Sequence, residues 1–252
     1  MSSHDKPLSL SAPTGERLSK RVAALRACSR REAEQYIEGG WVRVDGVVVE
    51  EPQHRVRHER VEIDADATLI TDSAVTLLLN KPADCPDGGK SLALLGAASH
   101  FSHDTSVIRP LKRHFVGLSS LVALETGASG LLVFTQDWRV TRKLTKDAAL
   151  LEHEYTVDVE GQVSADALAR LNRGLSSDPQ ALARVKVSIN SSNESWSKLR
   201  FAVKGVHVGL LAHLCERVNL KILGMKRLRI GRVALTQLPV GQWRYLLPHE
   251  RF

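Results

Sequence analysis

Apolar residues in the first part of the chain have the spacing of two short helices. Over residues 18–25 they recur every three or four positions, as one buried helix face requires. A second helix is predicted over residues 29–37, because Ser29 followed by Glu32 is a capping-box pattern, in which each side chain satisfies a backbone N–H of the first turn. The Gly-Gly pair that follows ends this helix.

A small sheet is predicted directly after these helices. The residues expected to form its strands lie at 41–44, 47–49 and 61–63. Asp45-Gly46 joins the first two strands and is a strong hairpin signal, because glycine tolerates a positive φ. We therefore expect a first folded module over residues 16–65, preceded by a polar tail.

A longer domain is predicted over residues 75–248, after a polar stretch rich in small residues that is typical of a linker. Strand-like segments lie at 75–79, 131–134, 155–159, 185–189, 199–203 and 228–230. Helical patterns lie at 138–146, 164–174 and 208–218. Strands and helices do not alternate regularly, so the pattern predicts an α+β domain with a mixed, mostly antiparallel sheet.

The composition narrows the classes of protein that fit this chain. Hydrophobic residues make up 43% of the 252 residues, and no apolar run approaches the roughly 20 residues of a membrane span. The three cysteines are far apart and form no metal-binding or disulfide pattern. We therefore expect a cytoplasmic protein without a metal site. We also expect a monomer, because no exposed apolar repeat stands out.

Positive charge points to a polyanionic partner. The formal net charge is +7, and six of the basic residues lie between Arg17 and Arg31, a segment that contains no acidic residue. A second basic region runs from residue 196 to the C-terminus, where only Glu216 and Glu250 are acidic. A solvated, solubilising face would explain either region alone. Two basic regions on either side of a near-neutral middle favour nucleic acid.

The first module resembles the αL RNA-binding module that is named after the fourth protein of the small ribosomal subunit. The matching segments are 17–20, 29–34, 40–46 and 61–63. One departure is Ser19, where the family usually has Asp. The resemblance implies that five basic residues face RNA phosphates, namely Arg17, Lys20, Arg30, Arg31 and Arg43. Some of them could instead pair with acidic residues of the module, such as Glu34 and Glu38.

Five motifs in the rest of the chain follow the order and spacing of the RsuA/RluB/RluE/RluF group of bacterial ribosomal-RNA pseudouridine synthases. They lie at 79–82, 129–137, 152–157, 225–231 and 241–244. Together with the first module, the resemblance spans residues 16 to 248. It implies isomerisation of a uridine that is first taken out of the RNA stack, because the base must be detached from its ribose and rejoined through carbon.

The resemblance also implies particular site residues. The family has a nucleophilic carboxylate in a Gly-Arg-Leu-Asp motif, and this sequence reads Val122-Ala123-Leu124-Glu125 there. Glu125 thus stands for the nucleophilic Asp, and Ala123 stands where the family has Arg. Tyr155 matches the residue that packs on the flipped base and handles its proton, although a tyrosine in the core of the sheet would give the same pattern.

Further basic residues are assigned by the same resemblance. Lys226 is expected to support the electrostatics of the pocket, and RNA contacts are expected from Lys81, Arg227 and Arg229. Two departures accompany them. His153 stands where the family has Lys, and residues 207–214 are largely apolar where the family has several cations.

Three hypotheses for the function remain open at this point. The first is a cofactor-independent pseudouridine synthase that acts on ribosomal RNA. The second is a catalytically silent RNA-binding homologue of that family, favoured by the departures at positions 123, 125 and 207–213. The third is a basic protein that binds other proteins, which would show no salt-sensitive affinity for RNA. The sequence identifies no target uridine, because specificity for RNA comes from its shape and loop context.

Overall fold

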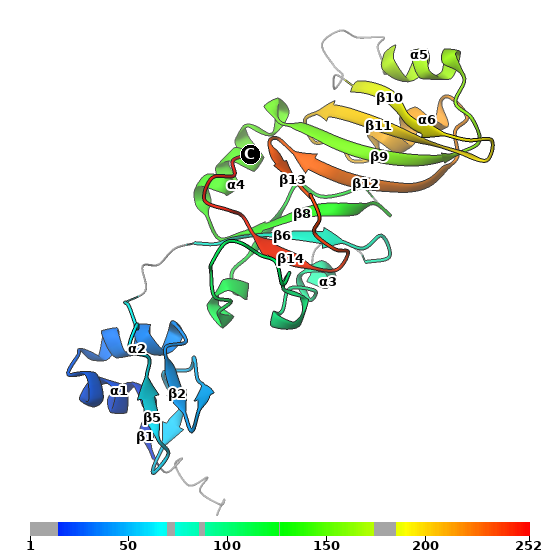
Figure 1. The fold of residues 1–252 in the computed structure, drawn as a ribbon. Coiled ribbons are helices and arrows are strands. Elements are labelled where there is room, and N and C mark those ends of the chain that lie inside the picture. The colour runs from blue at the N-terminus through cyan, green and yellow to red at the C-terminus, as the bar shows by residue number, and fades with distance from the viewer. Residues whose placement is uncertain (1–14, 70–73, 86–88, 126, 174–184) are drawn as a thin grey trace, which may run out of the picture. The chain divides into compact units, whose positions relative to one another are not determined.

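The computed structural model describes residues 15–69, 74–85, 89–125, 127–173 and 185–252. The chain forms two compact units (Figure 1). Unit 1 consists of residues up to 73 together with the segment 110–116, and unit 2 consists of residues 74–109 and 117–252. In the described parts of the chain, no helix is long and apolar enough to cross a membrane. The domain boundaries 16–65 and 75–248 stay predictions, and no sequence pattern indicated that 110–116 belongs with unit 1.

Unit 1 contains the two predicted helices and small antiparallel sheets. Its elements are β1 (Glu16–Arg17), α1 (Leu18–Arg26), α2 (Arg30–Glu38), β2 (Val42–Val44), β3 (Val47–Val48), β4 (Arg55–Val56), β5 (Val61–Ile63) and η2 (Lys112–Phe115). Strands β3, β2 and β5 form one sheet, and β1 pairs with β4. Leu18 and Val22 of α1 pack with Ala33 and Ile37 of α2 in one apolar core over the sheet.

The local signals in unit 1 have the expected geometry. The Ser29 backbone N–H donates to the Glu32 carboxylate at 2.7 Å, and the Glu32 N–H donates to the Ser29 hydroxyl at 3.2 Å. Both residues of the hairpin turn, Asp45 and Gly46, have positive φ angles, of 49° and 81°. This is the conformation of the tight hairpin turns that match the twist of a sheet, and it confirms the predicted hairpin.

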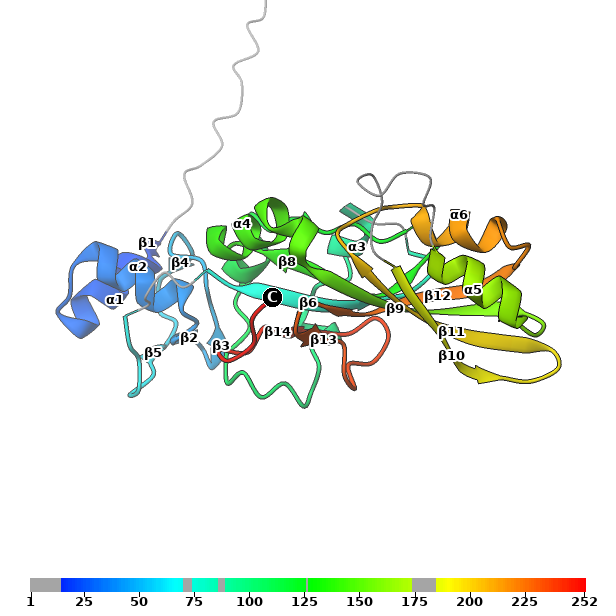
Figure 2. The same cartoon turned by 90° about the horizontal axis from the view of Figure 1, so that it is seen from above.

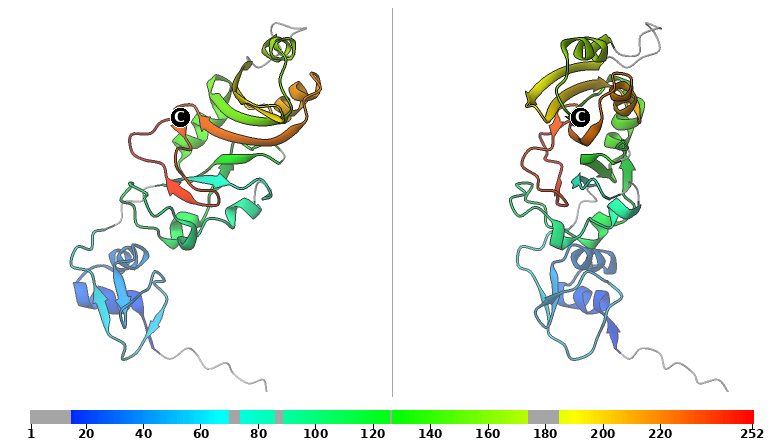
Figure 3. Two further views of the ribbon diagram at one scale, coloured as in Figure 1. Left: turned by 45° about the vertical axis from the view of Figure 1, so that its right-hand side comes forward. Right: turned by 90° about the vertical axis from the view of Figure 1, so that its right-hand side faces the viewer.

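Unit 2 is built on a mixed, mostly antiparallel sheet, as predicted. Its strands are β6 (Thr76–Lys81), β7 (Ser119–Leu121), β8 (Ser129–Thr135), β9 (Glu152–Glu160), β10 (Val185–Ser192), β11 (Trp196–Lys204), β12 (Ile222–Ile230), β13 (Val233–Ala234) and β14 (Trp243–Tyr245). The order is β10-β11-β9-β12-β8-β6-β14, with β13 beside β12 and β7 beside β8. The pair β12–β8 is parallel. The yellow to orange strands curve strongly in Figure 3.

Short helices accompany this sheet. They are α3 (Gly89–Leu92), η1 (Ala97–Ser99), α4 (Trp138–Lys146), η3 (Ala148–Leu150), α5 (Ala165–Arg173) and α6 (Leu210–Glu216). Figure 2 shows α5 and α6 near the half of the sheet that contains β10, β11, β9 and β12, and α4 near β8. Leu144 of α4 packs with Leu131 and Val133 of β8 in the core. Helices α4, α5 and α6 confirm the three helices predicted in this domain.

Two of the sequence motifs in unit 2 meet at the edge of the sheet. The Asn80 N–H donates to the Gln242 carbonyl at 3.0 Å, and the Gly241 N–H donates to the Asn80 carbonyl at 2.8 Å. The Asn80 side-chain amide also donates to the Leu238 carbonyl at 2.7 Å. The first and last motifs therefore join the two ends of the unit.

Candidate functional site

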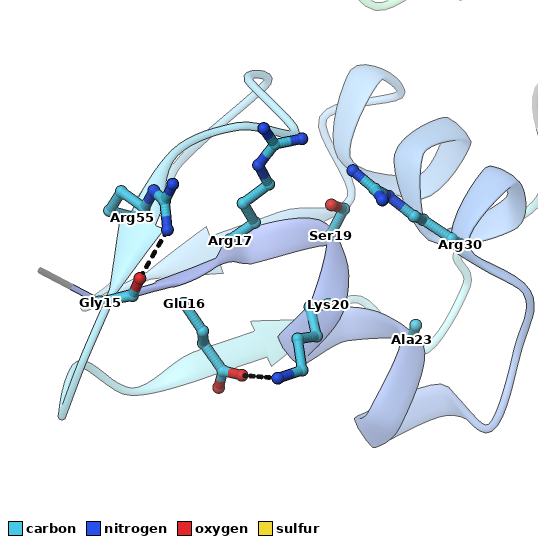
Figure 4. Close-up of a pocket in the computed structure, with 8 residues that line it drawn as sticks. All are labelled: Gly15, Glu16, Arg17, Ser19, Lys20, Ala23, Arg30 and Arg55. Atoms are coloured by element: carbon cyan, nitrogen blue, oxygen red, sulfur yellow. Dashed lines mark hydrogen bonds and ion pairs between the residues drawn. The ribbon is translucent and has the colours of Figure 1, made fainter. Parts of the chain in front are cut away.

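A basic hollow lies in unit 1 between strands β1 and β4 and the two helices. It has a volume of about 630 Å³ and is lined by Gly15, Glu16, Arg17, Ser19, Lys20, Ala23, Arg30 and Arg55. Figure 4 shows that the three arginines come from β1, α2 and β4, and that Ser19 lies between Arg17 and Arg30. Ser19 is 1% exposed. Four cations around one carboxylate make this hollow suited to an anion.

The cations of this hollow have few acidic partners. Lys20 Nζ lies 3.9 Å from a Glu16 oxygen, and Arg30 Nε lies 3.2 Å from Glu34. Arg55 donates to the Gly15 carbonyl at 2.7 Å and remains exposed. Such exposed pairs contribute little free energy, so these side chains can turn toward phosphate oxygens.

Other basic residues of unit 1 lie outside the hollow. Arg31 is exposed on α2, and Arg43 on β2 has a guanidinium nitrogen 3.7 Å from an Asp64 oxygen. Their predicted RNA contacts stay predictions. Arg55 was not singled out from the sequence. It lies beside the buried Val56 on β4, and because successive side chains of a strand alternate between faces, Arg55 points outward.

In unit 2, Glu125 lies on the loop that leads from β7 to β8. Its carboxylate is almost fully buried, with 5% of the residue exposed. Its Oε1 atom accepts a hydrogen bond of 3.0 Å from the backbone N–H of Leu211, in the first turn of α6. Burial raises the pKa of Glu125, and the N–H groups of Leu211 and Ala212 oppose this by favouring the ionised form.

Helix α6 thus takes the place of a cation at Glu125. Among the described residues Glu125 forms no ion pair, and the side chain at position 123 is an exposed alanine. Cys215 of α6 is buried, and this burial, followed by the charge of Glu125, raises the pKa of its thiol to about 12. The carboxylate is therefore held by main-chain donors in an apolar setting.

Tyr155 lies on β9 with 7% of the residue exposed. Its Cα is paired with that of Phe201 on β11 and with that of Arg227 on β12. Directly paired residues on neighbouring strands point to the same face of a sheet. Tyr155 and Arg227 therefore share one face of the sheet. The roles of Tyr155 in stacking on the base and in proton transfer stay predictions.

Arg227 connects this face to the loop of Glu125. It is 0% exposed, and its guanidinium donates to the carbonyl oxygens of Leu131 at 2.8 Å, Ala123 at 3.1 Å and Val122 at 2.7 Å. A contact with RNA would require this network to open. The structure thus favours an internal role for Arg227 over the RNA contact predicted for it.

Lys226 lies next to Arg227 but points elsewhere. Its Cα is paired with those of Thr156 and Ser129, one position along from the pairs that include Tyr155 and Gly130. Because successive side chains of a strand alternate between faces, Lys226 points to the face opposite Tyr155. The role predicted for Lys226 in the electrostatics of the pocket stays a prediction.

The two remaining predicted RNA contacts have partners within the protein. Arg229 binds Glu152 at 2.7 Å and Glu154 at 3.1 Å, across neighbouring strands. Lys81 is 2% exposed, and its ammonium donates to the Pro82 carbonyl at 3.0 Å and to a further carbonyl of the loop that follows. Both contacts with RNA would have to compete with these internal bonds, and Lys81 would also have to become accessible.

Comparison with known proteins agrees with this architecture. Residues 16–61 match the family model described as the S4 domain. The chain is 27% identical over 236 residues to ribosomal small subunit pseudouridine synthase A of Pseudomonas aeruginosa, which covers 93% of this chain and 98% of the relative. It is 26% identical over 243 residues to ribosomal large subunit pseudouridine synthase B of Bacillus subtilis, with 93% of each chain covered.

A solved structure shares the fold of this chain. A crystal structure of a pseudouridylate synthase matches with a TM-score of 0.54 at 18% identity, covering 91% of this chain and 95% of that one. The S4 match lies within the RNA-binding module expected at residues 16–65. The S4 domain, the relatives along most of the chain and the shared fold confirm its similarity to the RsuA/RluB/RluF type of ribosomal-RNA pseudouridine synthases.

Proposed function

We propose that this protein is a pseudouridine synthase that isomerises uridine to pseudouridine in ribosomal RNA, with Glu125 as its nucleophile. The observation that carries the proposal is the buried carboxylate of Glu125, 5% exposed and held at 3.0 Å by the Leu211 N–H. A buried carboxylate with so few partners is costly to keep unless it has a function. Independent support comes from ribosomal small subunit pseudouridine synthase A of Pseudomonas aeruginosa, to which 93% of this chain aligns at 27% identity.

The reaction needs a positioned carboxylate and a water-poor site, and it needs no redox chemistry. The bond from C1′ to N1 of the uracil breaks, the base turns, and C5 forms the new bond to C1′. The proton on C5 leaves, and N1 gains one, so that product and substrate have the same atoms. A carboxylate attacks as the anion, and the Leu211 N–H lies where it stabilises that anion.

The pH dependence follows from the surroundings of Glu125. Burial raises its pKa and therefore favours the neutral acid, which is no nucleophile. Turnover should rise with pH as Glu125 ionises through this raised pKa. Tyr155 is proposed to stack on the extruded uracil and to handle its proton, because it shares the face that Arg227 links to the Glu125 loop.

Unit 1 is proposed to grip the RNA beside the target uridine. Arg17, Lys20 and Arg30 surround one hollow with Arg55, and their charges would replace counterions on the phosphate backbone. Arg31 and Arg43 would extend this contact. We propose that the protein acts in the cytoplasm, the compartment that contains ribosomal RNA in bacteria. We also propose that it acts as a monomer without a cofactor.

A tritium-release assay tests the proposal. Ribosomal RNA transcribed with tritium at C5 of uridine loses label to water when C5 joins the ribose. We expect release by the wild-type protein and none by Glu125→Gln, a variant that keeps an oxygen for the Leu211 N–H. Mapping pseudouridines in ribosomal RNA from cells with and without the gene would then identify the target.

Folded wild-type protein that binds ribosomal RNA in a salt-sensitive manner but releases no tritium would be a catalytically silent RNA-binding protein. In that case cells lacking the gene would keep all their ribosomal pseudouridines. A protein with neither turnover nor salt-sensitive binding would exclude both functions.

A further inference from the structure

The buried guanidinium of Arg227 is directed at the main chain of the loop that carries Glu125. It donates to two successive carbonyls of this loop, at 2.7 Å to Val122 and at 3.1 Å to Ala123. It also donates at 2.8 Å to the Leu131 carbonyl of β8. Hydrogen bonds from a charged donor are short and strong, and the planar fork of an arginine fixes the direction of each one. Arg227 therefore ties the start of the loop to the sheet.

The same stretch of loop has a strained backbone. Val122 has a φ of 60°, in the left-handed region that L-residues avoid and β-branched residues avoid most. In the family motif this position is glycine, which adopts a positive φ without strain. A valine keeps this conformation only when its surroundings hold it there. The hydrogen bond from Arg227 to the Val122 carbonyl supplies such a restraint.

Glu125 is held by a main-chain donor and not by a cationic side chain. Its carboxylate accepts from the Leu211 N–H at 3.0 Å, and the guanidinium that the family places at position 123 is replaced by a methyl group. No side-chain cation among the described residues fixes the carboxylate by an ion pair. Its position therefore depends on the backbone of residues 122–125 more directly than in a site with a guanidinium clamp.

We propose that Arg227 is a positioning residue, which holds residues 122–125 in a strained conformation that aims the Glu125 carboxylate. This inference rests on the proposed synthase function, because aiming is needed for attack on the ribose or base. Arg227 acts through the loop and touches no substrate. The main chain of Arg227 is also packed closely against β8, because a Cβ atom added at Gly130 would lie 2.2 Å from the Arg227 carbonyl oxygen.

Steady-state kinetics of Arg227 variants test the proposal. We expect Arg227→Lys to lower kcat by about 10- to 100-fold, the loss typical when a reacting group shifts by about 1 Å. KM for RNA should stay within about twofold, because binding and aiming are separate. The pH at which turnover is half-maximal on the acid side should not move, because burial and backbone N–H groups are what shift the pKa of Glu125.

A second substitution separates aiming from general stability. Val122→Gly removes the strain that Arg227 opposes, so the double variant Val122→Gly, Arg227→Lys should recover about tenfold of the lost kcat. Val107→Gly is the matched control. Val107 is also a valine with a positive φ, of 61°, but it is 97% exposed and no atom of Arg227 bonds to it. Its substitution should give no recovery.

Hydrogen exchange of the loop gives a readout that does not need turnover. Amides of residues 122–125 should exchange faster in Arg227→Lys, while the β9 and β11 amides keep their protection. Unchanged kcat and unchanged exchange in Arg227→Lys would overturn the proposal, as would equal recovery by Val107→Gly. If wild-type protein releases no tritium, the synthase function fails while exchange still decides whether Arg227 holds the loop. Arg227→Gln serves the same comparison should Arg227→Lys not fold.

Discussion

His153 should make the stability of this protein depend on pH between 5 and 7.5. It lies on β9 with 1% of the residue exposed, and neither ring nitrogen has a hydrogen-bond partner among the described residues. Burial, and then the charges of Arg227, His207 and Arg229, lower the pKa of His153 to about 3. The folded protein therefore keeps the imidazole neutral.

The sign and the size of the effect follow from linkage. In the unfolded chain His153 titrates at its ordinary value of 6.5. The contribution is fully present above pH 6.5, and it falls as pH decreases from 6.5 toward 3, because only the unfolded state takes up the proton. Between pH 7.5 and pH 5 the free energy of unfolding should drop by about 2 kcal/mol from this group, from 1.36 kcal/mol per pKa unit.

Urea unfolding at pH 7.5 and pH 5 measures this change. His153→Leu, which has a similar volume and cannot be protonated, should lack about 2 kcal/mol of the wild-type drop. It should also be at least as stable at pH 7.5, because two unpartnered buried nitrogens are removed. His103→Leu is the control, since His103 is exposed. Equal drops in wild type and His153→Leu would refute the reasoning.

Two further predictions concern the site and the RNA-binding unit. Glu125→Asp restores the residue of the family motif, but its shorter side chain withdraws the carboxylate from the Leu211 N–H, which lies 3.0 Å from Glu125. We therefore expect kcat in the tritium assay to fall by about 100-fold. Equal or faster turnover would show that the position of the Glu125 carboxylate is not the one that the reaction needs. Arg55→Gln should weaken RNA affinity and reduce the salt dependence of binding by about one charge, whereas Arg60→Gln, outside the hollow, should do neither in a titration at several salt concentrations.

Most of the fold could be predicted because its main elements have their own periodicity. The helix expected at 138–146 has these bounds in the structure, and the strand expected at 155–159 lies within β9. Strands β7, β13 and β14 were missed. They have two or three residues each, too few to show a period, and they exist because of the strands they pair with.

The site was predictable only where its chemistry is carried by side chains. Glu125 was found by counting along a motif, but its partner is a backbone N–H of Leu211, which leaves no mark in the sequence. Arg227 was expected at the RNA because it belongs to a basic motif that resembles the family's. Residues two apart on a strand point to the same face, so Arg227 lies on the same buried face of β12 as Met225. A register shift between residues 227 and 229 interrupts this alternation before Ile230.

The departures from the family motif are not independent losses. Without a guanidinium at position 123, a carboxylate needs other donors, and the first turn of α6 provides the Leu211 N–H. An apolar start to α6 buries that turn beside Glu125, where charged side chains would bring in water. The extra methylene of Glu lengthens the side chain toward this donor. The three changes thus fit one site that holds its carboxylate by main-chain hydrogen bonds.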